Sequence, residues 1–171
     1  MNTFLLSPVG RYVSYRKIDE TTSKNHICVA AMMSLVKTPE LYACGVSYSG
    51  IPDIITMMKA IPLNRFAYLE SFKTVWYDTS TKAEAEIARE VSPVYQAKRI
   101  KDPLFVIQGA LDRQIPITDT DRIVESLRRQ RIESPYMVKY DEGPGYVRWE
   151  NRVEMYKCML GFLAKTFSVK N

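Results

Sequence analysis

The segment 103–109, PLFVIQG, is the clearest predicted strand of the sequence. Its run of consecutive apolar residues is short and ends at a glycine, which is typical of a strand that a parallel sheet buries on both faces. Two more strands are expected, 41–48 before it and 136–140 after it. Helical patterns separate the three strands, so right-handed crossovers would place them side by side in parallel. The predicted fold class is therefore α/β.

Helical patterns occupy most of the chain between these strands. Helices are expected at 27–36, 53–61, 82–91, 118–131 and 149–167, and the rest of 62–92 is expected to be irregular. Thr118 is expected to cap the fourth helix. Ahead of the first helix, a short strand is expected at 11–16.

The last helix shows the most regular apolar spacing of the chain. Its apolar residues recur at steps of four and three, as Trp149, Val153, Tyr156, Leu160, Leu163 and Phe167. Residues at this spacing lie on one face of a helix. We expect that face to be buried against the sheet.

Composition excludes several classes of protein. The chain has 171 residues, 46% of them hydrophobic and 25% charged, as expected of one globular domain without a membrane span. The formal net charge of +5 is scattered among acidic residues, so no nucleic-acid partner is expected. Three cysteines without CxxC spacing predict neither disulfides nor a zinc site, and no cofactor is expected. With no signal peptide recognised, a cytoplasmic location and reduced, buried cysteines are expected.

The chain contains 1 histidine, His26, which restricts acid–base chemistry. A histidine base must be this residue or come from another chain. Cys28 lies two residues away, and a cysteine–histidine pair could catalyse acyl transfer. Residues two apart on a helix do not face each other, so we expect a capping histidine and a buried cysteine instead.

Strings in the second half resemble a known enzyme family. The strings are SPVYQAKRIKDPLFVIQGALDRQIP at 92–116, IVESLRRQ at 123–130 and DEGPGY at 141–146. Their order and spacing resemble the end of the catalytic domain in the prolyl oligopeptidase family of serine peptidases. The segment 35–54, LVKTPELYACGVSYSGIPDI, extends the similarity back to about Asn25. The resemblance implies a partial α/β-hydrolase fold, with the last parallel strands and flanking helices but without the N-terminal part of the sheet.

The same resemblance assigns three positions of a catalytic triad. In the family, an aspartate lies in G-x-x-D-x-x-V-P, a histidine in D-E-G-H-G and a serine in G-x-S-x-G-G. Asp112 matches the aspartate, but Pro144 stands at the histidine position and Asn25 where the serine belongs. Proline cannot accept a proton from a nucleophile, so the resemblance implies a triad that retains only Asp112.

Ser47 and Glu142 each have two possible interpretations. Ser47 lies in GVSYSG at 45–50, which is similar to a nucleophile elbow but has one residue too many before the second glycine. We expect Ser47 to be an ordinary strand residue. Glu142 could be a second acid beside Asp112, but a solvated surface carboxylate is the expected interpretation.

The first residues resemble a different part of the same family. The segment 6–15, LSPVGRYVSY, is similar to a strand motif of the family's β-propeller. The predicted organisation is an N-terminal segment at 1–24, a propeller-strand remnant, followed by a truncated hydrolase domain at 25–171. Truncation would leave the strand 41–48 without its neighbour. Either the strand at 12–16 covers that edge, or two chains form a homodimer through it.

The expected function is that of a catalytically inactive relative of peptide hydrolases, with peptides as ancestral substrates. One alternative is an interaction module that binds a related intact peptidase. Another is a hydrolase with a different nucleophile, such as Ser47 or Cys28. The sequence leaves open whether the chain is a working product or the relic of a decayed gene.

Overall fold

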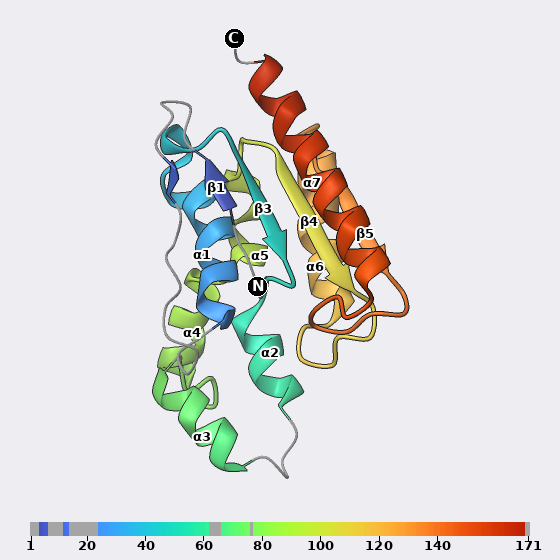
Figure 1. Cartoon of the computed structure of the whole chain (residues 1–171). Coiled ribbons are helices and arrows are strands. Elements are labelled where there is room, and N and C mark those ends of the chain that lie inside the picture. The colour runs from blue at the N-terminus through green and yellow to red at the C-terminus, as the bar shows by residue number, and fades with distance from the viewer. Residues whose placement is uncertain (1–3, 7–11, 14–23, 62–65, 76, 170–171) are drawn as a thin grey trace.

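The centre of the structure, a computed structural model, is a five-stranded sheet of order β2-β1-β3-β4-β5 (Figure 1). The structure describes residues 4–6, 12–13, 24–61, 66–75 and 77–169. The strands are β1 (Phe4–Leu6), β2 (Tyr12–Val13), β3 (Cys44–Tyr48), β4 (Leu104–Gly109) and β5 (Tyr136–Lys139). β3, β4 and β5 are parallel, which confirms the predicted α/β arrangement. Their carboxyl ends therefore meet at one edge of the sheet.

Helices lie on both faces of this sheet. They are α1 (Lys24–Lys37), α2 (Ile54–Ala60), α3 (Phe66–Val75), α4 (Lys82–Glu90), α5 (Pro93–Gln96), α6 (Ile117–Arg129) and α7 (Trp149–Val169), with 3-10 turns η1 (Pro39–Leu41) and η3 (Ala97–Arg99). In Figure 1, α7 crosses one face of β4 and β5, and α6 lies behind them. No helix in the described part of the chain has the length and apolar character needed to cross a membrane.

β4 joins the two hydrophobic layers. Its side chains alternate, with Leu104 and Val106 packing in the layer that contains α1 and α6, and Phe105 and Ile107 in the layer under α7. Every residue of the strand is buried. The continuous apolar run of β4 is thus explained by helices on both faces of the sheet.

β1 covers the edge of β3. It pairs antiparallel with β3, from Phe4 opposite Val46 to Leu6 opposite Cys44. β2 then pairs with β1, so the strand predicted at 12–16 contributes only Tyr12 and Val13 and does not contact β3 as its neighbour. β1 was not predicted, because it is only three residues long and its partner β3 lies far away in the sequence. A homodimer through the sheet edge stays a prediction.

Three other expectations were wrong. α3 lies in the stretch expected to be irregular. α6 begins at Ile117 with Pro116 at its N-cap, so Thr118 is inside the helix and does not cap it. Cys44 is buried as expected, whereas Cys158 is exposed. Neither Cys44 nor Cys158 forms a disulfide among the described residues, and the side chain of Cys28 lies outside them.

The apolar stripe of α7 was predicted to face the sheet, but four of its residues are exposed. Trp149 is 64% exposed, Val153 42%, Tyr156 45% and Leu160 67%. Met155, Met159 and Phe162 face the sheet instead, together with the buried polar residues Asn151 and Thr166. The apolar spacing correctly predicted that α7 has an apolar face. It did not predict which face meets the sheet, because the buried face contains polar residues among its apolar ones and so shows no continuous apolar spacing.

The loops after β4 and β5 approach each other closely at Gly109. A Cβ atom there would lie 2.0 Å from the carbonyl oxygen of Gly143 and 2.5 Å from that of Glu142, both backbone atoms. We therefore expect Gly109→Ala to lower the free energy of unfolding by about 1–3 kcal/mol, measured by urea denaturation. The control is Gly161→Ala in α7, where a Cβ would meet nothing within 4 Å. The control should stabilise the chain by about 1 kcal/mol, and a stable Gly109→Ala protein contradicts the close approach.

Candidate functional site

Two loops at the carboxyl edge of the sheet form the candidate site. They follow β4 and β5, and backbone hydrogen bonds join them directly. The amide of Ala110 donates to the carbonyl of Lys139 over 2.9 Å, and the amide of Leu111 donates to that of Glu142 over 2.9 Å. In open α/β sheets, functional groups gather at this edge. The loops therefore bring the predicted positions Asp112 and Pro144 to the same end of the sheet.

Asp112 is fixed by its own loop. Its side chain is buried, and Oδ1 accepts hydrogen bonds from the amides of Gln114 at 2.9 Å and Ile115 at 3.0 Å. This Asx-type turn sets the direction of the carboxylate. Within the described part of the chain, the buried Oδ2 has no hydrogen-bond partner. One oxygen thus orders the loop, while the other is available to a further donor.

Burial changes the acidity of this carboxyl group. Loss of water contact raises the pKa of Asp112 above its ordinary value, and the amides of Ile115 and Gln114 and the nearby side chain of Gln108 only partly offset that rise. An unpaired carboxylate is costly to bury, which is why burial moves the pKa of Asp112 upward. In a triad, a histidine N–H would reduce this cost by hydrogen bonding to the free oxygen.

Glu142 is not the solvated carboxylate that the sequence predicted. It is 2% exposed and accepts hydrogen bonds from the amides of Val147 at 2.8 Å and Arg148 at 3.1 Å, and from Nδ2 of Asn151 at 2.7 Å. Burial alone would raise the pKa of Glu142, but these donors, led by Asn151, hold it below its ordinary value. The carboxylate thus joins the loop to the first turns of α7 and is structural.

Pro144 lies exposed between two glycines of the second loop. A Cβ on Gly143 would lie 3.9 Å from the carbonyl oxygen of Leu111, next to Asp112. A Cβ on Gly145 would lie 3.8 Å from the hydroxyl of Tyr48, at the end of β3. The two neighbours of Pro144 therefore lie near the Asp112 loop and the end of β3, and the side chain of Pro144 offers neither a proton donor nor an acceptor.

Tyr48 and Tyr146 hold the second loop over the end of β3. The amide of Tyr146 donates to the hydroxyl of Tyr48, and the two rings pack edge to face at 5.2 Å between centroids. The hydroxyl of Tyr146 donates to the carbonyl of Gln108 over 3.2 Å. Burial raises the pKa of both phenols, so they remain neutral hydrogen-bonding groups at physiological pH.

Of the other proposed nucleophiles, only the side chain of Ser47 lies among the described residues. Ser47 is 1% exposed and lies within β3, which confirms it as a strand residue. Asn25, His26 and Cys28 lie in α1, but their side chains are outside the described residues. Ser49, which sequence reasoning did not identify, follows β3 with a left-handed φ of 48°. Its buried hydroxyl has no partner in the described part of the chain.

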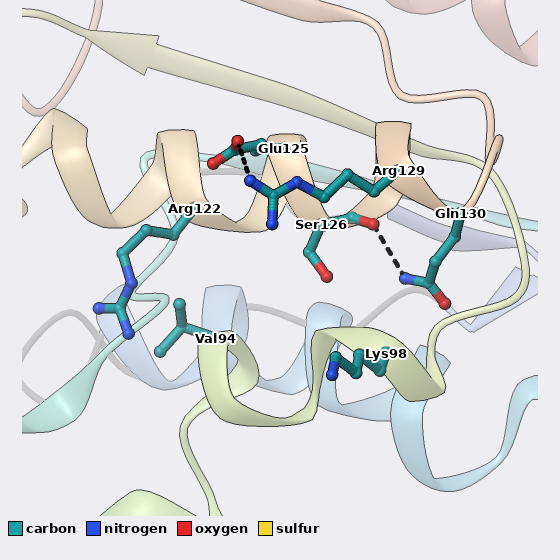
Figure 2. Close-up of a pocket in the computed structure, with 7 residues that line it drawn as sticks. All are labelled: Val94, Lys98, Arg122, Glu125, Ser126, Arg129 and Gln130. Carbon is teal, nitrogen blue, oxygen red and sulfur yellow. Dashed lines mark hydrogen bonds and ion pairs between the residues drawn. The ribbon is translucent and has the colours of Figure 1, made fainter.

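One hollow among the described residues lies away from the two loops. It has a volume of about 410 Å³ and lies between α6 and the segment that contains α5 and η3 (Figure 2). Its charges are largely paired within the protein. Arg129 contacts Glu125 at 2.5 Å, and Arg122 lies 3.4 Å from both Asp53 and Asp119. No residue of the two candidate loops lines this hollow, and no cluster of potential metal ligands occurs among the described residues.

Comparison with known proteins identifies the family of this chain. A sequence model of the Prolyl oligopeptidase family matches residues 28–170. The chain belongs to the prolyl oligopeptidase family. It is 32% identical over 136 residues to dipeptidyl aminopeptidase BIII of Pseudoxanthomonas mexicana, covering 80% of this chain and 20% of that protein. It is 29% identical over 133 residues to dipeptidyl peptidase family member 6 of Caenorhabditis elegans, covering 77% and 18%.

Solved structures show the same fold. A crystal structure of puromycin hydrolase superimposes with a TM-score of 0.72 at 24% identity, over 82% of this chain and 21% of that one. Pyrococcus horikoshii acylaminoacyl peptidase gives a TM-score of 0.70 at 22% identity, over 83% and 22%. The parallel strands and flanking helices are thus a partial α/β-hydrolase fold, and the chain spans about a fifth of the length of these relatives.

The pH dependence of stability distinguishes the two buried acids. A carboxyl group with a raised pKa stabilises the fold below its unfolded pKa, and this contribution is lost as the pH rises through the folded pKa. Relative to Asp112→Asn, the unfolding free energy of the wild-type protein should therefore fall as the pH rises above about 4, the ordinary pKa of an aspartate. Relative to Glu142→Gln it should gain unfolding free energy as the pH rises, because that pKa is lowered. Equal slopes in chemical denaturation would contradict these environments.

Proposed function

We propose that this polypeptide is a catalytically inactive member of the serine peptidase family to which it belongs. The observation that carries the proposal is Pro144, which stands in the D-E-G-x-G string where the family places its general base. A serine hydroxyl becomes a nucleophile only when a base removes its proton, and proline has no group that can do so.

The surroundings of Asp112 support the same proposal. Its loop holds the carboxylate in a fixed direction, and the described residues give Oδ2 no N–H donor of the kind that a triad histidine supplies. The single histidine, His26, precedes Asp112 in sequence, whereas the family order is serine, aspartate, histidine. Asn25 at the expected serine position removes the nucleophile as well.

A hydrolase with another nucleophile receives little support from the described part of the chain. The Ser47 side chain lies inside a fully buried strand, where substrate cannot reach it. Cys44 is similarly buried. The truncated organisation, the peptide substrates of an ancestor and a cytoplasmic location remain parts of the proposal.

Activity-based labelling tests this function directly. Removing triad residues lowers turnover by on the order of 10⁴ to 10⁶. We therefore expect neither fluorophosphonate labelling nor hydrolysis of an aminoacyl anilide above background, under conditions in which an intact relative shows both. Labelling that is abolished by Ser47→Ala, or by Cys28→Ala with a cysteine-directed probe, would instead establish a different nucleophile.

Pro144→His separates the position of the site from its activity. If the two loops retain the triad frame, the new imidazole can donate a hydrogen bond to the free Oδ2 of Asp112. This hydrogen bond should raise the pKa of the imidazole above about 6.5, the ordinary value for histidine. NMR titration can measure this, with His26 as the second histidine signal and Pro144→His/Asp112→Asn as the matched control. Turnover should stay absent because Asn25 is unchanged. An imidazole insensitive to Asp112→Asn would show that Pro144 is not at the histidine position.

A further inference from the structure

The hollow between α6 and the segment of α5 and η3 has more basic than acidic residues in its lining (Figure 2). Lys98, Arg122 and Arg129 line it together with one acidic residue, Glu125, and one apolar residue, Val94. Its volume of about 410 Å³ lies within the range of small-molecule pockets, about 300–1,000 Å³. Among the described residues, this basic hollow therefore offers a ligand charge and hydrogen-bonding groups but little apolar surface.

Buried carboxylates hold Arg122 in place at one end of the basic hollow. Its Nη1 atom lies 3.4 Å from Oδ2 of Asp53 and 3.4 Å from Oδ1 of Asp119, whose side chains are only 1% and 6% exposed. Each carboxylate also lies at the N-terminal end of a helix, α2 for Asp53 and α6 for Asp119, which offsets part of its charge. Arg122 itself is half-exposed, and its guanidinium has five N–H donors, more than the two carboxylates use. Arg122 is thus positioned in advance to bind an anion.

Lys98 and Arg129 are less constrained than Arg122. Lys98 on η3 is exposed and has no ion-pair partner among the described residues. Arg129 pairs with Glu125 at 2.5 Å, but both side chains are largely exposed to solvent. Ion pairs this exposed are weak, so an anionic ligand can compete with Glu125 for the guanidinium of Arg129. Two further cations can therefore turn toward a ligand at low cost.

Hydrogen bonds fix the two walls of the basic hollow relative to each other. Nε2 of Gln130, at the end of α6, donates to the carbonyl of Ala97 in η3 over 3.2 Å. Near Arg122, the hydroxyl of Tyr95 in α5 donates to Oδ2 of Asp53 over 2.8 Å. In Figure 2, Arg122 and Gln130 lie at opposite ends of the gap, and the hydroxyl of Ser126 points into it between them. Because the walls are already ordered, a ligand meets a preformed site.

We propose that the basic hollow binds a small polyanion, a ligand with several anionic groups and no large apolar part. Arg122 and Arg129 lie on α6 and Lys98 on η3, so the cations approach a ligand from both walls and can each bind a separate anionic group. Guanidinium groups bind phosphate and carboxylate oxygens in pairs, and an ammonium group adds a point charge. Condensed phosphates and polycarboxylates share this chemistry. The site includes no residue of the two candidate loops, so it does not depend on peptidase activity.

Isothermal titration calorimetry of the full chain with pyrophosphate tests this site. Lys98→Gln and Arg129→Gln should each weaken pyrophosphate binding about tenfold, because each variant removes one charge-assisted contact. Glu125→Gln should instead strengthen binding, because it removes the acidic lining residue and releases Arg129. All three side chains are exposed, so the fold should be retained, which circular dichroism confirms.

Two matched controls separate this site from general attraction to a basic protein. Arg128→Gln changes the residue next to Arg129 and removes the same charge, but Arg128 lines a different hollow with Asp121 and Tyr136. Lys101→Gln removes an exposed charge near Lys98 that does not line the basic hollow. At about 0.15 M ionic strength, where the screening length is about 8 Å, each control should change the affinity by less than about twofold.

Titrations of the wild-type chain with citrate and with inorganic phosphate complete the test. Pyrophosphate or citrate binding that exceeds inorganic phosphate binding and responds to the three lining variants supports the proposal, and the tighter of the two identifies the kind of anionic group. The absence of binding by both polyanions at millimolar concentrations overturns it. Equal losses in Arg128→Gln and Arg129→Gln also overturn it, because binding would then follow net charge. Inorganic phosphate that binds as tightly as both polyanions would show that only one anionic group is bound, which contradicts the proposal.

Discussion

The approach of the Gly109 backbone to the carbonyl oxygens of Glu142 and Gly143 determines the rest of the candidate site. It allows the loops after β4 and β5 to bond to each other through main-chain atoms, and the buried Glu142 carboxylate then joins the second loop to α7. None of these contacts uses the side chain at position 144. A proline at position 144 is therefore compatible with the observed arrangement of Asp112 and the surrounding frame.

Features that depend on local sequence were predicted well. The apolar run of β4 predicted a strand buried on both faces, and the alternation of helices and strands predicted the parallel order of β3, β4 and β5. The Asx bonds of Asp112 are equally local, because they reach only two and three residues along the chain.

Features that depend on distant partners were not predicted. Glu142 was expected in solvent, since the sequence does not show that its donors lie at the start of a helix that folds back over the sheet. The pairing of β1 with β3 joins segments about 40 residues apart, and three-residue strands carry too little pattern to reveal it. The apolar spacing of α7 defined a face, but Met155 and Met159, not Trp149 and Leu160, meet the core.

The loops after β4 and β5 are expected to form one rigid frame that does not depend on the side chain at position 144. Amide hydrogen exchange measures this most directly. The amides of Leu111, Ile115, Val147 and Arg148, each bonded within this frame, should exchange as slowly as those of strand β4. Rapid exchange of these amides while β4 stays protected would contradict the claim, because it would show that the loops separate in a chain that lacks the histidine.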